Sequence, residues 1–369
     1  MLFSLQYLRG IASLLVVFYH ARSELNGVYA QSDLGDLLFS NGYIGVDLFF
    51  MISGFVIMLS TERDKSPFSF IIKRLFRVYP AYFVCLIFAM LVFNKSFDIE
   101  FFKAMAFVNL DISSSPPFFG YSIILTAWTL MYEIIFYILF AISMSISWRH
   151  RLPICSIIIL LIVTSLNYFY NDGVKIDGYA AIPLPSHSQN IMLFARVLSS
   201  PMFYEFIIGM IIYWLYSHIK PGMILTKISK PLLLSSVMAF IFFFLSGYNG
   251  GHGLLNCGLF AAILLFSCVI YERCYPVKIS PPLNMLGDIS YSLYLIHPLV
   301  ISLLAYGIIT TVAYTQHKGF SSLFLIFAMS IPPSIAMFYF VEKKFVLLAR
   351  DILSKSNSQT ANNTTRFTI

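Results

Sequence analysis

The chain has 369 residues, of which 59% are hydrophobic and only 11% charged, and its formal net charge is +7 at neutral pH. Soluble domains carry about 25% charged residues, so this composition excludes a water-soluble fold for most of the chain. The basic residues form short clusters between apolar runs, which is typical of membrane topology and argues against a nucleic-acid partner. We therefore expect a lipid bilayer to surround the chain.

Apolar runs long enough to cross a hydrocarbon layer about 30 Å thick recur along the whole sequence. The first run begins close to Met1, with no basic segment before it and no small-residue cleavage site after it, so we expect a retained span. The pattern predicts an all-α fold, a polytopic transmembrane helical bundle of about ten spans. The predicted spans are Ser4–Ala21, Tyr43–Ser60, Tyr79–Phe93, Ser122–Ile146, Leu152–Tyr170, Ser199–Ser217, Pro231–Gly247, Leu254–Tyr271, Asp288–Val312 and Ser321–Val341.

Loops between ten spans alternate between the two sides of the membrane, so the distribution of Lys and Arg predicts the orientation. Of the 24 basic residues, 18 fall on one side and the other six are Arg22, Lys95, Lys103, Lys175, Arg196 and Lys318. The positive-inside rule then places both termini in the cytoplasm. The polar segment 354–369 predicts a disordered cytoplasmic tail, which leaves residues 1–353 as the transmembrane domain.

Two ionisable side chains lie in the first predicted span. Arg9 and His20 are eleven residues apart, which on an α-helix is three turns plus about 20°, so both face the same way about 16 Å apart along the axis. Ionisable groups inside a bilayer cost about 2.5–3.5 kcal/mol each and mark functional cavities. The alternative is that Arg9 reaches the inner headgroups while His20 anchors the outer interface.

Asp47 lies near the outer end of the second predicted span, at a depth similar to that of His20. A carboxylate at that depth can pair with the imidazole, orient it and stabilise its protonated form, as carboxylates do for catalytic histidines. The alternative is that Asp47 caps the span where it leaves the interface.

Arg74 and Arg77 follow the second span and share one helix face at the predicted cytoplasmic boundary. The guanidinium fork binds phosphate oxygens bidentately, so the pair suits an anionic, phosphate-bearing ligand. An ordinary positive-inside loop has the same pattern, and taken alone the pattern favours that interpretation.

Glu133 lies close to the middle of the fourth predicted span. A short carboxylate cannot reach either interface from there, so we expect it to face the protein interior, either paired with an Arg or a His or protonated. This is the strongest physical indication of a functional cavity. Glu205, in the sixth span, lies at a shallower depth and fits a structural role.

His297 precedes Pro298 in the ninth predicted span, where the proline removes a backbone hydrogen bond and kinks the helix. The kink favours a pocket beside the imidazole, although a lone histidine in a span more often bonds a neighbouring helix. No second His or Cys lies at ligand spacing and no C-x-x-C pair is present, so we expect no metal site and no disulfide framework.

Five segments resemble, in order, motifs of the acyltransferase-3 family of bacterial membrane proteins, especially the stand-alone members that O-acetylate exopolysaccharides and lipopolysaccharide O-antigens. The segments are LRGIASLLVVFYH (8–20), GVDLFFMISGF (45–55), KRLFRVYPAY (73–82), WTLMYEIIFY (128–137) and GDISYSLYLIHP (287–298). Two features depart from the family pattern. The chain ends after the tenth span, so we expect no extracytoplasmic esterase-like domain, and the last span ends VEKKF where many members have a proline.

The resemblance implies an acyltransferase with His20 as the catalytic histidine, Arg9 as its partner, and Arg74 and Arg77 in the acyl-CoA site. His20 is then the general base, because an imidazole with an ordinary pKa of about 6.5 suits proton abstraction at neutral pH. The resemblance also implies acetyl-CoA as the donor, no permanently bound cofactor, and a glycan or lipid-linked glycan acceptor on the periplasmic side of a bacterial inner membrane. The other expected site residues are Asp47 and Glu133 in catalysis, and Ser53, Trp128, Tyr132, Tyr291 and His297 around the substrate.

Two further function classes are compatible with buried charges. A proton-coupled transporter would move a lipid-linked glycan or an acyl donor and leave the thioester intact, whereas a transferase releases free thiol in proportion to the acceptor modified. A membrane scaffold would use the charges only to bond its helices. Within the enzyme hypothesis, either the pantetheine arm threads inward past Arg9 or the acyl group passes through a covalent intermediate.

Overall fold

The computed structural model describes residues 2–171, 173–183, 190–248, 250–310, 314 and 318–366, without the side chains of 190–193 and 356–366. This part of the chain is helical and contains no β-strand. The α-helices are α1 (Phe3–Ala21), α2 (Leu34–Phe39), α3 (Ile44–Ser60), α4 (Pro67–Val92), α5 (Ile99–Met105), α6 (Trp128–Ile146), α7 (Arg151–Tyr170), α8 (Asn190–Leu198), α9 (Phe203–His218), α10 (Met223–Leu245), α11 (Cys257–Cys274), α12 (Pro281–Asp288), α13 (Ser290–Ala305), α15 (Phe320–Met337) and α16 (Lys343–Arg366). Short 3₁₀ turns are η1 (Arg22–Leu25), η2 (Ser40–Tyr43) and η3 (Leu125–Ala127), and η4 (Phe338–Glu342) is a π-helical turn.

Eight helical segments among the described residues are long and apolar enough to cross a membrane, and the bent pair α12–α13 makes a ninth. These segments correspond to nine of the ten predicted spans, and the polytopic all-α bundle is confirmed. The remaining predicted span is α1. This helix is less apolar than the others because Gln6, Arg9 and His20 interrupt its 19 residues. α1 instead packs against α3, α12 and α13 in the middle of the bundle, where polar side chains face protein.

Glycines let the central helices approach closely. A Cβ atom on Gly45 of α3 would lie 2.4 Å from the carbonyl oxygen of Ala12 in α1. A Cβ atom on Gly209 of α9 would lie 1.9 Å from the carbonyl oxygen of Met51 in α3. Small residues at such contacts allow helix backbones to pack without lipid between them. α3 is therefore held tightly between α1 and α9.

A sharp bend separates α12 from α13. The two helices meet at 70° around Ile289. Gly10 of α1 and Gly287 of α12 make the close contact here, since a Cβ on Gly287 would lie 2.2 Å from the carbonyl oxygen of Gln6. The bend brings the first residue of α13, Ser290, beside Arg9 of α1.

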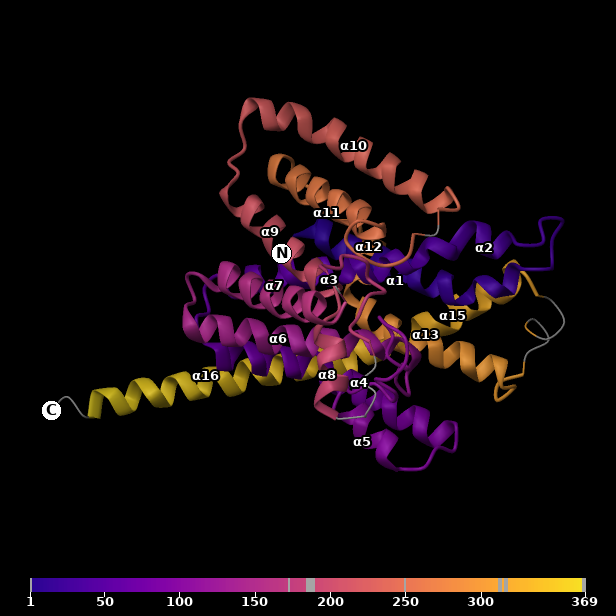
Figure 1. Cartoon of the computed structure of the whole chain (residues 1–369), viewed down its shortest axis with the longest axis horizontal. Coiled ribbons are helices and arrows are strands. Elements are labelled where there is room, and N and C mark those ends of the chain that lie inside the picture. Colours follow the sequence, from indigo (N-terminus) through magenta and orange to yellow (C-terminus); the bar gives the residue numbers. More distant parts are fainter. Residues whose placement is uncertain are drawn as a thin grey trace.

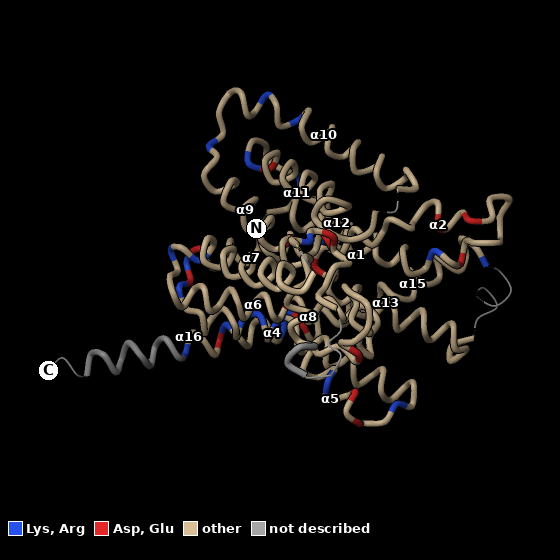
Figure 2. The backbone as a smooth tube through the Cα atoms, viewed as in Figure 1, with Lys and Arg blue, Asp and Glu red and all other residues tan. Residues whose placement is uncertain are grey.

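The outer parts of the bundle are arranged around this centre (Figure 1). α10 runs along one edge beside α11, and α16 begins next to α4 and extends away from the other helices. Figure 2 shows that most Lys and Arg residues gather at the end of the bundle toward which α16 extends. The cytoplasmic position of both termini stays a prediction, as does the division at residue 354 between a membrane domain and a disordered tail, because α16 is helical to Arg366.

Candidate active site

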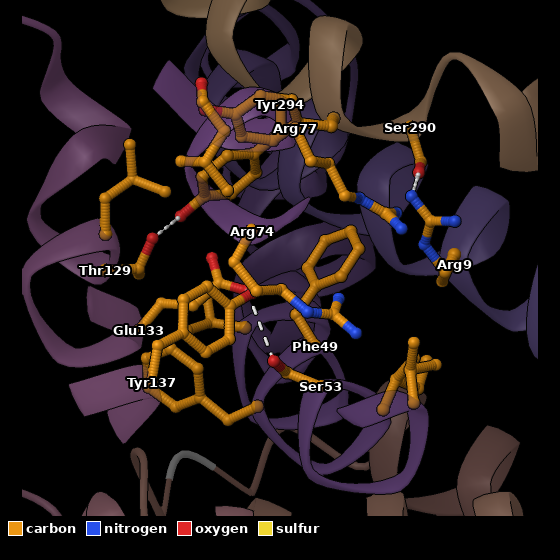
Figure 3. A pocket seen from close by; sticks show the side chains of 17 residues that line it. Arg9, Phe49, Ser53, Arg74, Arg77, Thr129, Glu133, Tyr137, Ser290 and Tyr294 are labelled. Atoms are coloured by element: carbon orange, nitrogen blue, oxygen red, sulfur yellow. Dashed lines mark hydrogen bonds between the residues drawn. The ribbon is translucent and has the colours of Figure 1, made fainter. Parts of the chain in front are cut away.

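A cavity of about 100 Å³ lies where α1, α3, α4, α6 and α13 meet (Figure 3). Six of the predicted site residues line it, namely Arg9, Ser53, Arg74, Arg77, Glu133 and Tyr291. They come from five helices that are far apart in sequence, and they include two of the ionisable side chains that the sequence placed inside spans, Arg9 and Glu133.

Three arginines face this cavity without a carboxylate partner. Arg9 donates through Nη2 to Ser290 Oγ at 2.9 Å, and Arg74 donates through Nη2 to Ser60 Oγ at 2.6 Å. Figure 3 shows the Arg77 guanidinium turned toward that of Arg9. No salt bridge joins any of the three to a carboxylate within the described part of the chain. A cluster of unpaired guanidinium groups in a closed site suits a ligand that carries negative charge.

Glu133 is the one carboxylate on the cavity wall among the described residues. Its Oε1 accepts a hydrogen bond from Ser53 Oγ at 3.2 Å and a second from the hydroxyl of Tyr137. Among the described residues, neither an arginine nor a histidine lies within hydrogen-bond distance of it, so of the two expectations the one of an Arg or His partner is not met. The Tyr137 ring also lies below the Arg74 guanidinium, whose Cζ is 5.6 Å from the ring centroid. Tyr137 was missed in the sequence, although it follows Glu133 by four residues and so shares its helix face.

His20 contacts His297 at the far end of α1 from Arg9. His20 Nδ1 lies 3.0 Å from His297 Nε2, and the two rings stack with centroids 5.2 Å apart. His297 is fully buried, and its Nδ1 lies 2.8 Å from the carbonyl oxygen of Leu293. Both ring nitrogens of His297 make these contacts, and its predicted position beside the substrate stays a prediction.

These two contacts assign the protons of both rings. A carbonyl only accepts, so His297 Nδ1 carries the hydrogen that it donates to Leu293. A buried ring without a carboxylate partner is neutral, which leaves His297 Nε2 as an acceptor. His20 Nδ1 must then donate to His297 Nε2, which leaves the lone pair of the His20 ring on its own Nε2. His20 Nε2 is thus free to accept a proton, and the ring is only partly buried.

The predicted pairing of His20 with Asp47 is wrong. Asp47 Oδ2 lies 2.7 Å from Nδ1 of His252, and the backbone N–H of Gly253 donates to Asp47 Oδ1 at 3.1 Å. His252 lies in the loop between α10 and α11, so the sequence does not indicate how deep in the membrane its side chain lies. Its only sequence signal is the glycine-flanked segment GGHG at 250–253, which permits a tight loop against the helices.

Trp128 and Tyr132 lie outside the cavity wall. The Trp128 ring contacts the His252 ring with centroids 5.9 Å apart. The Tyr132 hydroxyl donates to the carbonyl oxygen of Pro117 at 2.9 Å, in the loop before α6. Both side chains therefore hold loops against the bundle.

Tyr294 connects the cavity to the histidine pair and was also missed in the sequence. It lines the cavity, and its ring lies 6.2 Å from the His297 ring between centroids. Its hydroxyl lies 3.0 Å from Thr129 Oγ1 (Figure 3). The arginine-lined cavity and the His20–His297 pair are therefore neighbouring parts of one site.

Comparisons with known proteins agree with this picture. A family model of an acyltransferase domain matches residues 2–339. The chain is 27% identical over 279 residues to the exopolysaccharide production protein ExoZ of Rhizobium meliloti (strain 1021), which covers 72% of this chain and 79% of that protein. It is 42% identical over 83 residues to nodulation protein 10 of Rhizobium leguminosarum bv. viciae, or 21% of each chain. No solved structure matches.

Proposed function

Because the chain belongs to the acyltransferase-3 family and is an acyltransferase, we propose that it O-acetylates a bacterial surface polysaccharide, with acetyl-CoA as the donor. The likeness to an exopolysaccharide production protein supports a polysaccharide acceptor. The family match gives no support to the transporter and scaffold alternatives. The multi-pass helical bundle belongs, in this proposal, to the inner membrane.

The observation that carries the proposal is the adjacency of an arginine-lined cavity to a histidine with a free nitrogen. Among the described residues, Arg9, Arg74 and Arg77 line the cavity together with one carboxylate, Glu133, so these side chains give the site an excess of positive charge. Coenzyme A carries several phosphate oxygens, which guanidinium groups bind by paired hydrogen bonds. We assign the arginines to the donor and His20 to the reaction.

The proposed reaction uses the lone pair of His20 Nε2. An acceptor hydroxyl gives its proton to Nε2 while its oxygen bonds to the acyl carbon of the thioester. The carbon–sulfur bond then breaks, and the leaving thiolate takes the proton from His20. The products are an O-acyl ester on the glycan and free coenzyme A. His297 keeps the His20 ring in the required tautomer through the Nδ1 to Nε2 hydrogen bond.

The test is mass spectrometry of surface polysaccharide from a deletion strain that carries the wild type, His20→Ala or His218→Ala. His218 is an exposed histidine at the end of α9, far along the chain from the proposed site, and serves as the matched control. We expect an acetyl-sized mass increment with the wild type and His218→Ala and none with His20→Ala at equal protein level. Removal of a general base lowers rates by about 10²–10⁴-fold.

Two results would contradict the proposal. An increment in the His20→Ala strain equal to that of the wild type would exclude His20 as the base. Polysaccharide that is the same with and without the wild-type protein would exclude a surface polysaccharide as the acceptor. Release of free thiol from acetyl-CoA by the purified protein, measured in parallel, tests the donor independently of the acceptor.

A further inference from the structure

A second cluster of reactive side chains lies outside the cavity, where α3, α9 and the start of α11 meet. Asp47 comes from α3, His252 from the loop before α11, and Cys257 is the first residue of α11. One ligand atom from each of these three residues lies within 4.8 Å of the other two. All three side chains are buried, and Cys257 is a free thiol. The acyl transfer described above uses none of them.

Glu205 of α9 lies beside the cluster, where its carboxyl group meets that of Asp47. The residue is fully buried, and neither Oε1 nor Oε2 meets a donor. Its carboxyl group lies beside Asp47 and Cys257. A Cβ atom on Gly258, the residue after Cys257, would lie only 3.1 Å from Glu205 Oε1. A buried carboxyl that finds no donor is costly, so its position calls for a compensating group.

The charges of the cluster match those of a divalent cation. Asp47 and Glu205 are two buried carboxyl groups at one place, and a protonated His252 could balance only one of them. A divalent ion would offset the charge of both carboxylates, with His252 neutral and Cys257 bound as a thiolate that releases its proton when the ion binds. Two carboxylates, an imidazole and a thiol are donors that Zn²⁺ accepts together.

The geometry is close to what such an ion requires. Bonds of about 2.0–2.3 Å around a tetrahedral ion place its ligand atoms about 3.3–3.8 Å apart. The ligand atoms of Asp47, His252 and Cys257 lie within 4.8 Å of one another, and the 2.7 Å contact between Asp47 Oδ2 and His252 Nδ1 would open slightly around an ion. The Glu205 carboxyl lies outside this set of three and would have to turn toward the ion. The Gly253 N–H, which donates to Asp47 Oδ1 at 3.1 Å, orients that carboxylate as outer partners of metal ligands do. The rings of Tyr43 and Trp128 lie against the His252 ring and shield the proposed metal site from water.

We propose that Asp47, Glu205, His252 and Cys257 bind one divalent transition-metal ion, with Zn²⁺ the preferred ion, at a structural site that fastens α3 to α9 and α11. This departs from the expectation of no metal site, which considered only residues at short ligand spacing. The four proposed ligands come from three helices and a loop, so no short sequence motif contains them. The site would fix α3, which contributes Phe49 and Ser53 to the cavity wall.

The test measures metal binding by the full-length protein, purified in detergent with its affinity tag removed. Co²⁺ is titrated as a spectroscopic probe, and bound metal is counted by elemental mass spectrometry after Zn²⁺ loading. We expect one ion per chain and a near-ultraviolet charge-transfer band that only a thiolate–Co²⁺ bond produces. Cys257→Ser should abolish the band. Glu205→Gln should weaken binding about tenfold or more, since loss of even an outer partner costs 10–100-fold.

Cys155→Ser is the matched control, because Cys155 is also fully buried but lies in α7. It should keep both the band and the stoichiometry. A wild-type protein that binds no ion, or binding that Cys257→Ser and Glu205→Gln leave unchanged, would overturn the proposal. Binding is measured without substrate, and both key variants are nearly isosteric. A failure here therefore leaves the acyltransferase proposal untouched.

Discussion

The protonation of two histidine rings follows from one backbone carbonyl. Leu293 fixes the hydrogen on His297 Nδ1, and this in turn fixes the hydrogen on His20 Nδ1. A catalytic histidine is commonly held in its tautomer by a carboxylate, which also stabilises the protonated ring. Here a neutral imidazole takes the orienting role, so His20 gains a defined tautomer without an added charge. The carboxylate that could have done this, Asp47, is engaged by His252.

His297 is therefore predicted to be a positioning residue. In His297→Ala, His20 loses its acceptor and can rotate or change tautomer, so kcat for acetyl transfer should fall by about 10²-fold or more, with little change in the KM for acetyl-CoA. His297→Gln should restore much of the loss, because a side-chain carbonyl near the Nε2 position can accept from His20 Nδ1–H. Steady-state kinetics on the purified protein would separate the two variants. Equal loss in both, or a change confined to KM, would contradict this role.

At the scale of helices, the sequence predicted the number of segments better than their ends and partners. Length and apolar character were sufficient to locate α3, α6 and the other long apolar helices. α4 begins at Pro67, well before the predicted Tyr79, because a helix can continue beyond the membrane where its residues become polar. Arg74 and Arg77 thus belong to the helix and line the cavity. The pattern alone favoured an ordinary positive-inside loop, whereas the family resemblance implied a binding site.

Partner choice between helices was not predictable from spacing. The matched depths of His20 and Asp47 suggested a pair, but depth alone does not give the angle around each helix. That angle depends on contacts such as that of Gly45 in α3 with α1 and that of Gly209 in α9 with α3, which follow from the packing of all the helices. Tyr294 was missed for the same reason.

The α3–α9 contact is predicted to tolerate no side chain at Gly209. In Gly209→Ala the new Cβ would lie 1.9 Å from the Met51 carbonyl oxygen, so the two backbones must separate. Overpacking of this kind costs about 1–3 kcal/mol, which should lower the Tm in detergent. Gly222→Ala is the control, since nothing lies within 4 Å of its added Cβ. A Tm for Gly209→Ala as high as that of the control would show that α3 and α9 are not in close contact.

For the molecule as a whole, the proposed site is polarised along α1. Arg9 lies toward the amino end of this helix and His20 at its carboxyl end. The amino end contacts the carboxyl end of α11, where the Phe3 and Ser4 N–H groups each donate to the Glu272 carboxylate at 2.8 Å. Arg273 and Lys278 follow at that end, which carries most of the basic residues. The proposed function then requires the donor and the acceptor to bind on opposite sides of the membrane.

This polarity requires that the amino end of α1 and the C-terminus both lie in the cytoplasm, as the basic residues predict. A fluorescent protein that folds only in the cytoplasm should fluoresce when fused after Ile369, and alkaline phosphatase, which is active only in the periplasm, should be silent there. A phosphatase fusion truncated after Lys175, in the loop that follows α7, should give the opposite result and serves as the control. An active phosphatase at the C-terminus would show that the bundle has the opposite orientation in the membrane. His20 would then face the cytoplasm together with acetyl-CoA, and the proposed transfer to a periplasmic acceptor would fail.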